Sequence, residues 1–178
     1  MAFAIASATT ACSSSSSPTT CDASCKDGGG VRALRDAMKL VYNLTLQGGP
    51  TGAQDATTPC PLGGTAHVTG TASSVPDQGT TMVQLTYDFV ACDYAETDSD
   101  PTHTFSLTLT GTITETGNIA SEPSSTTSLT FASDAMTLGG TVFAPTVDYR
   151  VDACVIALSQ DGDNVSGKVC GRSAGTSL

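Results

Sequence analysis

The chain of 178 residues contains no tryptophan, and only 5% of its residues are aromatic. Because exposed aromatic rings form the usual stacking platforms for bases and sugars, such a platform is not expected. Positive charge is also scarce, since 7 Lys and Arg stand against 17 Asp and Glu and the net charge is −10. Binding to nucleic-acid phosphates requires clustered Lys and Arg, so we expect no nucleic-acid partner.

Long hydrophobic runs are missing too. No apolar stretch approaches the roughly 18 residues of a membrane-spanning helix, so only the N-terminus is expected to meet a membrane. Residues 1–11 are apolar and then small, without the basic start of a complete signal peptide. We expect them to be a signal peptide that is truncated at its start.

Thr9-Thr10-Ala11-Cys12 stands at the end of this stretch. It resembles the lipobox of bacterial lipoproteins, and the resemblance implies cleavage after Ala11 and lipidation of Cys12. By the same resemblance, Ser13 favours the outer membrane. An ordinary cleaved secretion signal and a tail with an incidental cysteine are the alternatives. Residues 12–28 begin with a serine run and are expected to form a flexible tether.

Six cysteines follow Cys12, and an even number in an exported chain predicts up to three disulfides. Cys154 and Cys170 lie at equal distances from Gly162, so a hairpin turning there would place them opposite each other. Two further cysteines flank the first predicted hairpin, and the last two pair by elimination. The predicted bridges are Cys154–Cys170, Cys60–Cys92 and Cys21–Cys25.

Hydrophobic periodicity divides the remaining chain into one helix and a β-rich body. Apolar residues recur at helical spacing over 31–50, which Gly48-Gly49-Pro50 would end. From Gly63 onward they alternate with threonine-rich polar residues, which is typical of antiparallel strands with one wet face. The predicted strands are 64–73, 80–91, 103–115, 126–134, 136–144, 146–159 and 164–172, with turns at 75–79, 116–118 and 161–163.

Four glycines interrupt these strands in similar surroundings, as in Val68-Thr69-Gly70-Thr71 and Val165-Ser166-Gly167-Lys168. Glycine inside a strand marks a bulge or sharp bend, so we expect a strongly curved sheet. The predicted fold is mainly β (α+β): a curved antiparallel sheet, sandwich or half-barrel of about seven strands. Short connections favour a meander, with the N-terminal amphipathic helix packed on it. Residues 29–178 would form this single domain, with a filled interior.

Candidate catalytic motifs are weak. Gly171 to Gly175 matches the G-x-S-x-G pattern, but no acid or histidine follows it. His67 and His103 lie on different predicted strands without zinc-ligand spacing, so we expect both at the surface. No enzyme activity and no cofactor are expected. Calcium is the one candidate ion, because Asp93, Glu96, Asp98 and Asp100 place carboxylates at spacings that its oxygen-rich shell can use.

The lipobox, serine tether, helix and cysteine-bridged β body together resemble uncharacterised β-rich lipoproteins of Gram-negative bacteria, a resemblance that implies no activity. We expect a non-catalytic, lipid-anchored, extracytoplasmic envelope protein with a binding or surface-structural role. The alternative is a carrier that holds an apolar ligand between the helix and the curved sheet. The sequence leaves the protein or small apolar partner unidentified.

Overall fold

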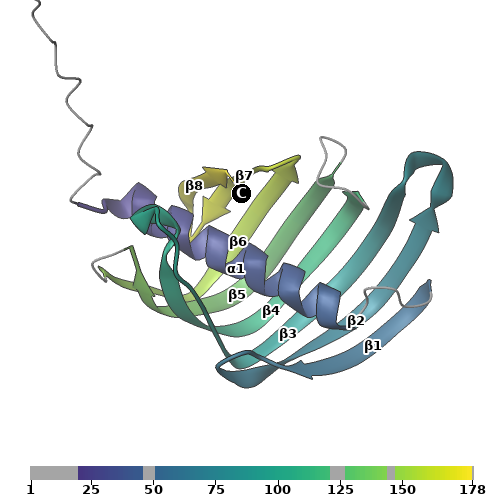
Figure 1. The fold of residues 1–178 in the computed structure, drawn as a ribbon, viewed down its shortest axis with the longest axis horizontal. Coiled ribbons are helices and arrows are strands. Elements are labelled where there is room, and N and C mark those ends of the chain that lie inside the picture. Colours follow the sequence, from purple (N-terminus) through teal and green to yellow (C-terminus); the bar gives the residue numbers. More distant parts are fainter. Residues whose placement is uncertain (1–19, 46–50, 121–126, 144–146, 178) are drawn as a thin grey trace, which may run out of the picture.

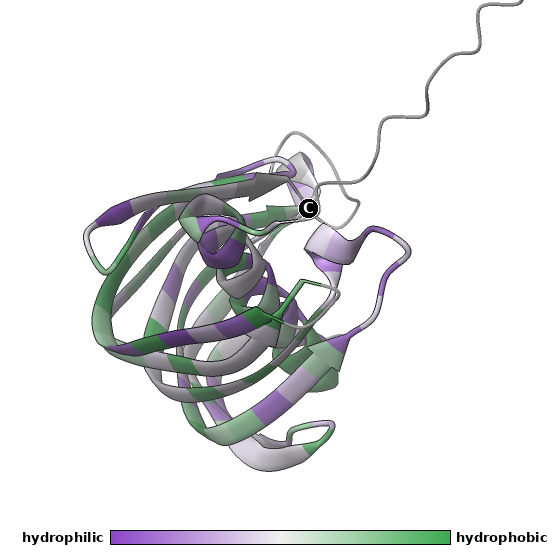
Figure 2. Ribbon diagram, turned by 90° about the vertical axis from the view of Figure 1, so that its left-hand side faces the viewer, coloured by the Kyte–Doolittle hydropathy of each residue, from purple (hydrophilic) through white to green (hydrophobic). Residues whose placement is uncertain are grey.

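The computed structural model describes residues 20–45, 51–120, 127–143 and 147–177 (Figure 1). Its architecture is one long helix, α1 (Ala23–Thr45), lying in the hollow of a strongly curved antiparallel sheet. Viewed from the side, the strands bow around the helix (Figure 2). The expected mainly β fold, with a curved sheet and one packed helix, is confirmed.

Eight strands follow one another in the sheet in the order in which they occur along the chain, so the expected meander is also confirmed. Single 3₁₀ turns, η1 (Pro76–Gln78) and η2 (Pro101–His103), connect β2 to β3 and β3 to β4. The strands are β1 (Gly52–Pro59), β2 (Gly63–Val75), β3 (Thr80–Glu96), β4 (Phe105–Ala120), β5 (Ser128–Val142), β6 (Val147–Asp161), β7 (Asn164–Val169) and β8 (Arg172–Ser177).

Three strand predictions were wrong. Both edge strands, β1 and β8, were missed because neither shows the alternation of apolar and polar residues that buried strands have. The predicted strands 126–134 and 136–144 are the single strand β5, whose pairing shifts between Ser133 and Met136 without ending the strand. The turn predicted at 116–118 lies within β4, where Gly117 is still paired on both sides.

Helix α1 begins eight residues earlier than predicted, so the expected tether over 12–28 is wrong at its C-terminal end. Asp22 caps the first turn, where its carboxylate accepts a hydrogen bond from the Cys25 N–H at 2.9 Å. The run Gly28-Gly29-Gly30 is helical although glycine disfavours helices. A Cβ atom on Gly30 would lie 2.6 Å from the Tyr149 ring, so the glycines permit a close approach to the sheet. The predicted C-terminal part, 46–50, lies outside the described residues.

The four mid-strand glycines have positive φ values in the curved sheet, and of the four only Gly111 lies at a register shift. Gly70 has a φ of 130° and Gly167 a φ of 149°, values that disfavour any residue with a Cβ atom. A Cβ atom on Gly70 would lie 2.1 Å from the carbonyl oxygen of Gln84 on the neighbouring strand. All four lie at inward positions of their strands, and a Cβ atom on any of them would come first against a backbone carbonyl oxygen of a neighbouring strand. The same backbone conformation recurs at all four positions, Gly70, Gly111, Gly140 and Gly167.

The hydrophobic core fills the space between α1 and the inner face of the sheet. The helix contributes an apolar stripe that includes Val31, Leu34 and Met38, all at most 3% exposed. Alternate residues of β2 to β7 supply the opposite wall, and the intervening residues face outward. Large buried side chains of this wall are Val68, Leu85, Tyr87, Phe89, Leu109, Ile113, Met136, Leu138 and Ile156.

All three predicted disulfides are present, with Cα–Cα distances of 5.2 Å for Cys21–Cys25, 5.4 Å for Cys60–Cys92 and 4.8 Å for Cys154–Cys170. The argument for the last bridge was wrong by one residue of register. The β6–β7 ladder pairs Asp161 with Asn164 and ends at Ile156 and Val169, so Cys154 has no partner on β7. Cys170 instead lies in the turn after β7, where its N–H donates to the Val155 carbonyl at 2.9 Å.

Candidate functional site

The outer face of the sheet carries short, neutral, hydroxyl-bearing side chains. Strand register aligns five of them, together with the amide side chain of Gln84, in a row across β2 to β7, which we call the outer hydroxyl row. Two of its hydroxyls, those of Thr116 and Thr130, lie 2.7 Å apart and hydrogen-bond across β4 and β5. Every member is exposed or half-buried, so the row is open to a partner. Its members are Thr71, Gln84, Thr116, Thr130, Ser159 and Ser166.

The outer face also carries His67, which contacts a carboxylate. Its Nε2 atom lies 2.7 Å from a carboxylate oxygen of Asp55 on the edge strand β1. The cross-strand neighbour of His67 is Asp88, which accepts a hydrogen bond from Thr112 at 3.4 Å. Both partners of the His67–Asp55 pair are well exposed. His67 is therefore a surface residue, as predicted, in a pair that solvent screens.

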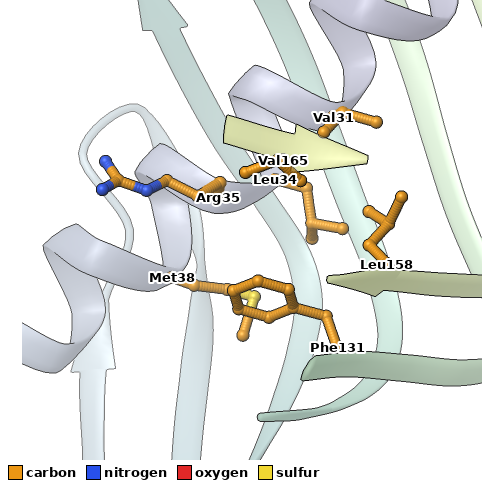
Figure 3. A pocket seen from close by; sticks show the side chains of 7 residues that line it. All are labelled: Val31, Leu34, Arg35, Met38, Phe131, Leu158 and Val165. Atoms are coloured by element: carbon orange, nitrogen blue, oxygen red, sulfur yellow. The ribbon is translucent and has the colours of Figure 1, made fainter. Parts of the chain in front are cut away.

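The inner face is filled where the helix meets β5, β6 and β7. The pocket at this point leaves ≈ 0 Å³ for a water-sized sphere. Figure 3 shows the apolar side chains directed toward one another and the Arg35 guanidinium directed away from them. No room for an apolar ligand is present at this pocket, where the carrier alternative would place one. Its lining residues are Val31, Leu34, Arg35, Met38, Phe131, Leu158 and Val165.

Among the described strand residues, the inner face buries one carboxyl group: Glu115 on β4 is only 5% exposed. Burial raises the pKa of its carboxyl to about 7, and the nearby Tyr87 hydroxyl and Arg35 guanidinium offset only part of that rise. The Tyr87 hydroxyl faces this carboxyl, yet no described group completes a hydrogen bond of good geometry with it. Glu115 was missed, although it continues the inward positions of Leu109 and Ile113.

A second buried carboxyl, Asp27, lies near the N-terminus of α1 and is 2% exposed. Its Oδ1 atom lies 2.8 Å from the Arg172 guanidinium on β8 and accepts a longer hydrogen bond, 3.4 Å, from the Tyr149 hydroxyl. This contact joins residues 145 positions apart in the chain. This contact was not predicted, because Asp27 falls within the expected tether. In the sequence, Arg172 drew attention only as part of the G-x-S-x-G pattern. Ser173 and Gly175 of that pattern lie in the extended strand β8.

The four predicted calcium ligands lie on one stretch but serve separate local contacts. Asp98 accepts a hydrogen bond from the Asp100 N–H at 2.8 Å, and Asp100 caps η2 by accepting from Thr102 N–H at 2.9 Å. These bonds lower the pKa values of both carboxyls. Asp93 accepts a hydrogen bond from Thr108. His103 faces Asp98 and Asp100, with N–O distances of 3.9 and 3.8 Å.

Glu96, the remaining member, points toward the helix. Burial and the neighbouring carboxylate of Asp36 on α1 raise its pKa. Among the described residues, no three Asp, Glu, His or Cys side chains are grouped so as to hold a metal ion. Calcium binding therefore stays a prediction without geometric support.

Cys12, the predicted lipidation site, lies outside the described residues. Within the described part, the helix lacks the long apolar stretch that crossing a membrane would take. No protein-family model, curated protein or solved structure matches the chain.

Proposed function

We propose that this protein is a non-catalytic, lipid-anchored protein of the bacterial envelope that binds or builds surface structure through the outer face of its sheet. The observation that carries the proposal is the contrast between the two faces. The inner face is filled by α1, while the outer hydroxyl row is exposed across six strands.

The disulfides support a location outside the cytoplasm. Three bridges use every described cysteine, and such bonds persist in oxidising compartments but are rare in the cytosol. The resemblance of residues 9–12 to a lipobox supports a lipid anchor at Cys12 and, with Ser13, an outer-membrane location. Anchoring through the tether would leave the outer face available to partners.

A catalytic role has less support from the described geometry. His67 is paired with Asp55, and His103 lies between two carboxylates that cap local turns. The Ser173 position is part of an edge strand and not of a strained strand-to-helix turn. The carrier alternative is not favoured, because the pocket under the helix is closed to a water-sized sphere.

The anchor is tested by the intact mass of the protein from the membrane fraction of a Gram-negative host, expressed with its native upstream coding region. We expect a chain that begins at Cys12, carries acyl groups and gains six hydrogens on reduction. Cys12→Ser is the control and should be neither acylated nor retained in the membrane. A wild-type chain without acyl groups would contradict the anchor.

The outer face is tested with the soluble Cys12→Ser chain and isolated envelopes, by co-sedimentation. Adding Thr116→Arg and Thr130→Arg should abolish sedimentation with little change in thermal stability, because both side chains lie in the centre of the outer hydroxyl row. Asp134→Arg, exposed on β5 but outside the row, is the matched control and should still sediment. Equal binding by all three chains would exclude the row as the binding surface.

A further inference from the structure

Strand register and the overlying helix together enclose Glu115. It lies opposite Leu85 on β3 and opposite Phe131 on β5, with Tyr87 diagonally adjacent on the same inner face. These neighbours are themselves 5% exposed or less. The carboxyl therefore lies between the sheet and the C-terminal half of α1, where an ionised group loses most of its hydration.

The cation that faces Glu115 is shared with another carboxylate. Arg35 on α1 has its Nη1 atom 3.2 Å from Asp36 Oδ1, and its side chain is 21% exposed. The other titratable groups facing Glu115 are Tyr87 on β3 and Tyr42 on α1, whose own pKa values are raised by burial and then by the Glu115 charge. On β5, the neighbour is the uncharged Phe131. No described counter-ion is therefore dedicated to an ionised Glu115.

We propose that Glu115 is a proton-dependent latch for the C-terminal half of α1, which is held on the sheet while the carboxyl is neutral and loosens when it ionises. A neutral carboxyl fits the enclosed position, whereas a carboxylate gains hydration if this part of the helix moves away. The N-terminal half stays in place, because Asp27 and Arg172 hold it to β8 at 2.8 Å. Loosening would expose the apolar inner face near Phe131 and Leu85.

The expected size of the effect follows from proton linkage. With a carboxyl pKa of about 7 when enclosed and 4.5 when exposed, the opening equilibrium of this helical segment rises roughly tenfold between pH 6 and pH 8. Below about pH 4.5 the latch is fully closed. The opening equilibrium stops rising once the pH is well above about 7, the pKa of the enclosed carboxyl.

Hydrogen exchange of the whole protein, resolved by residue and corrected for the intrinsic pH dependence of exchange, tests the latch. In the wild type, amides over 38–45 should lose protection roughly tenfold from pH 6 to pH 8, while those over 27–34 should not. Glu115→Gln should remove this dependence, because its neutral amide cannot ionise. Asp134→Asn, an exposed carboxylate on β5, should behave like the wild type.

Tyr87→Phe provides a second variant that keeps the carboxyl. Because the Tyr87 hydroxyl favours the ionised carboxylate, its removal should move the midpoint of the loss of protection to higher pH. The proposal is overturned if the wild type shows no pH dependence over 38–45, or if Glu115→Gln retains it. It is equally overturned if Tyr87→Phe leaves the pH midpoint of the loss of protection unchanged. This second variant keeps the test decisive if Glu115→Gln does not fold.

Discussion

Asp27 and Glu115 are both buried carboxyls at the interface between α1 and the sheet, but they have different partners. Asp27, 2% exposed, has the Arg172 guanidinium at 2.8 Å and a tyrosine hydroxyl as a second donor. Glu115, 5% exposed, shares its nearby arginine with Asp36 and faces a tyrosine hydroxyl without good hydrogen-bond geometry. Burial alone therefore does not decide whether a charged side chain stabilises the interface between the helix and the sheet. A dedicated counter-ion lets Asp27 hold the helix to the sheet, and the lack of one makes Glu115 sensitive to protons.

The largest effect should follow from removing the counter-ion of Asp27. Arg172→Met would leave a buried carboxylate unpaired and lower the free energy of unfolding by about 3 kcal/mol, the low end for buried pairs because Arg172 is 55% exposed. Urea denaturation at pH 7 measures the loss. Adding Asp27→Asn to this variant should recover part of it. A loss no larger than that of Lys168→Met, an exposed cation on β7, would refute this role of the Asp27–Arg172 pair.

Glu115→Gln should change how stability depends on pH. The folded pKa of Glu115, about 7, is raised above its usual 4.5, so its contribution is fully present below pH 4.5 and is lost as the pH rises through 7. Between pH 5 and pH 8 the wild type should therefore lose roughly 2.5 kcal/mol relative to the variant. Thermal unfolding across this range measures the difference. Parallel curves for the two proteins would show that Glu115 does not titrate in the fold.

Two glycine variants test whether close packing also holds the N-terminal half of α1. Gly30→Ala would bring a methyl group against the Tyr149 ring and should destabilise the fold by about 2 kcal/mol. Gly28→Ala is the matched control, because its new Cβ atom would lie 3.4 Å from the Gly175 carbonyl oxygen, an ordinary van der Waals distance. It should stabilise the helix by about 0.5–1 kcal/mol. Equal effects in chemical denaturation would refute the role of close packing at Gly30.

The smallest changes in stability are expected for the two variants Tyr149→Phe and Tyr87→Phe, and they should differ in sign or size. Tyr149→Phe removes a hydroxyl that donates to Asp27 at 3.4 Å and should cost about 0.5–1 kcal/mol. Tyr87→Phe removes a buried hydroxyl that lacks a well-formed hydrogen bond, so at pH 5 it should be neutral or stabilising by up to about 1 kcal/mol. Denaturation of both variants at pH 5 measures the pair. A larger loss for Tyr87→Phe than for Tyr149→Phe would reverse the comparison.

Sequence reasoning succeeded where the pattern was local. Alternation located the central strands, and the glycines at 70, 111, 140 and 167 predicted a curved sheet. Reasoning failed where contacts between distant residues overrode local preference. The run Gly28-Gly29-Gly30 was not expected to be helical, although its lack of side chains is what allows the helix to approach Tyr149. Strand β8 was also not predicted. It pairs with β7 at the edge of the sheet, and its Arg172 side chain contacts Asp27 on the helix.

The class of the fold, its curvature and the three cysteine pairs were predicted from local features, namely strand periodicity, glycine spacing and cysteine positions, although the register assumed for Cys154 and Cys170 was one residue off. Only the tertiary structure decided which of the many carboxyls would be buried and with what partner. Glu115 occupies an inward position that its alternation already indicated, but its environment depends on where α1 lies. Asp27 meets Arg172 because the first turns of the helix lie against the edge strand β8, far away in the chain. The free energy of a charge depends on its burial and its nearest counter-ion, and both are set by residues far away in the chain.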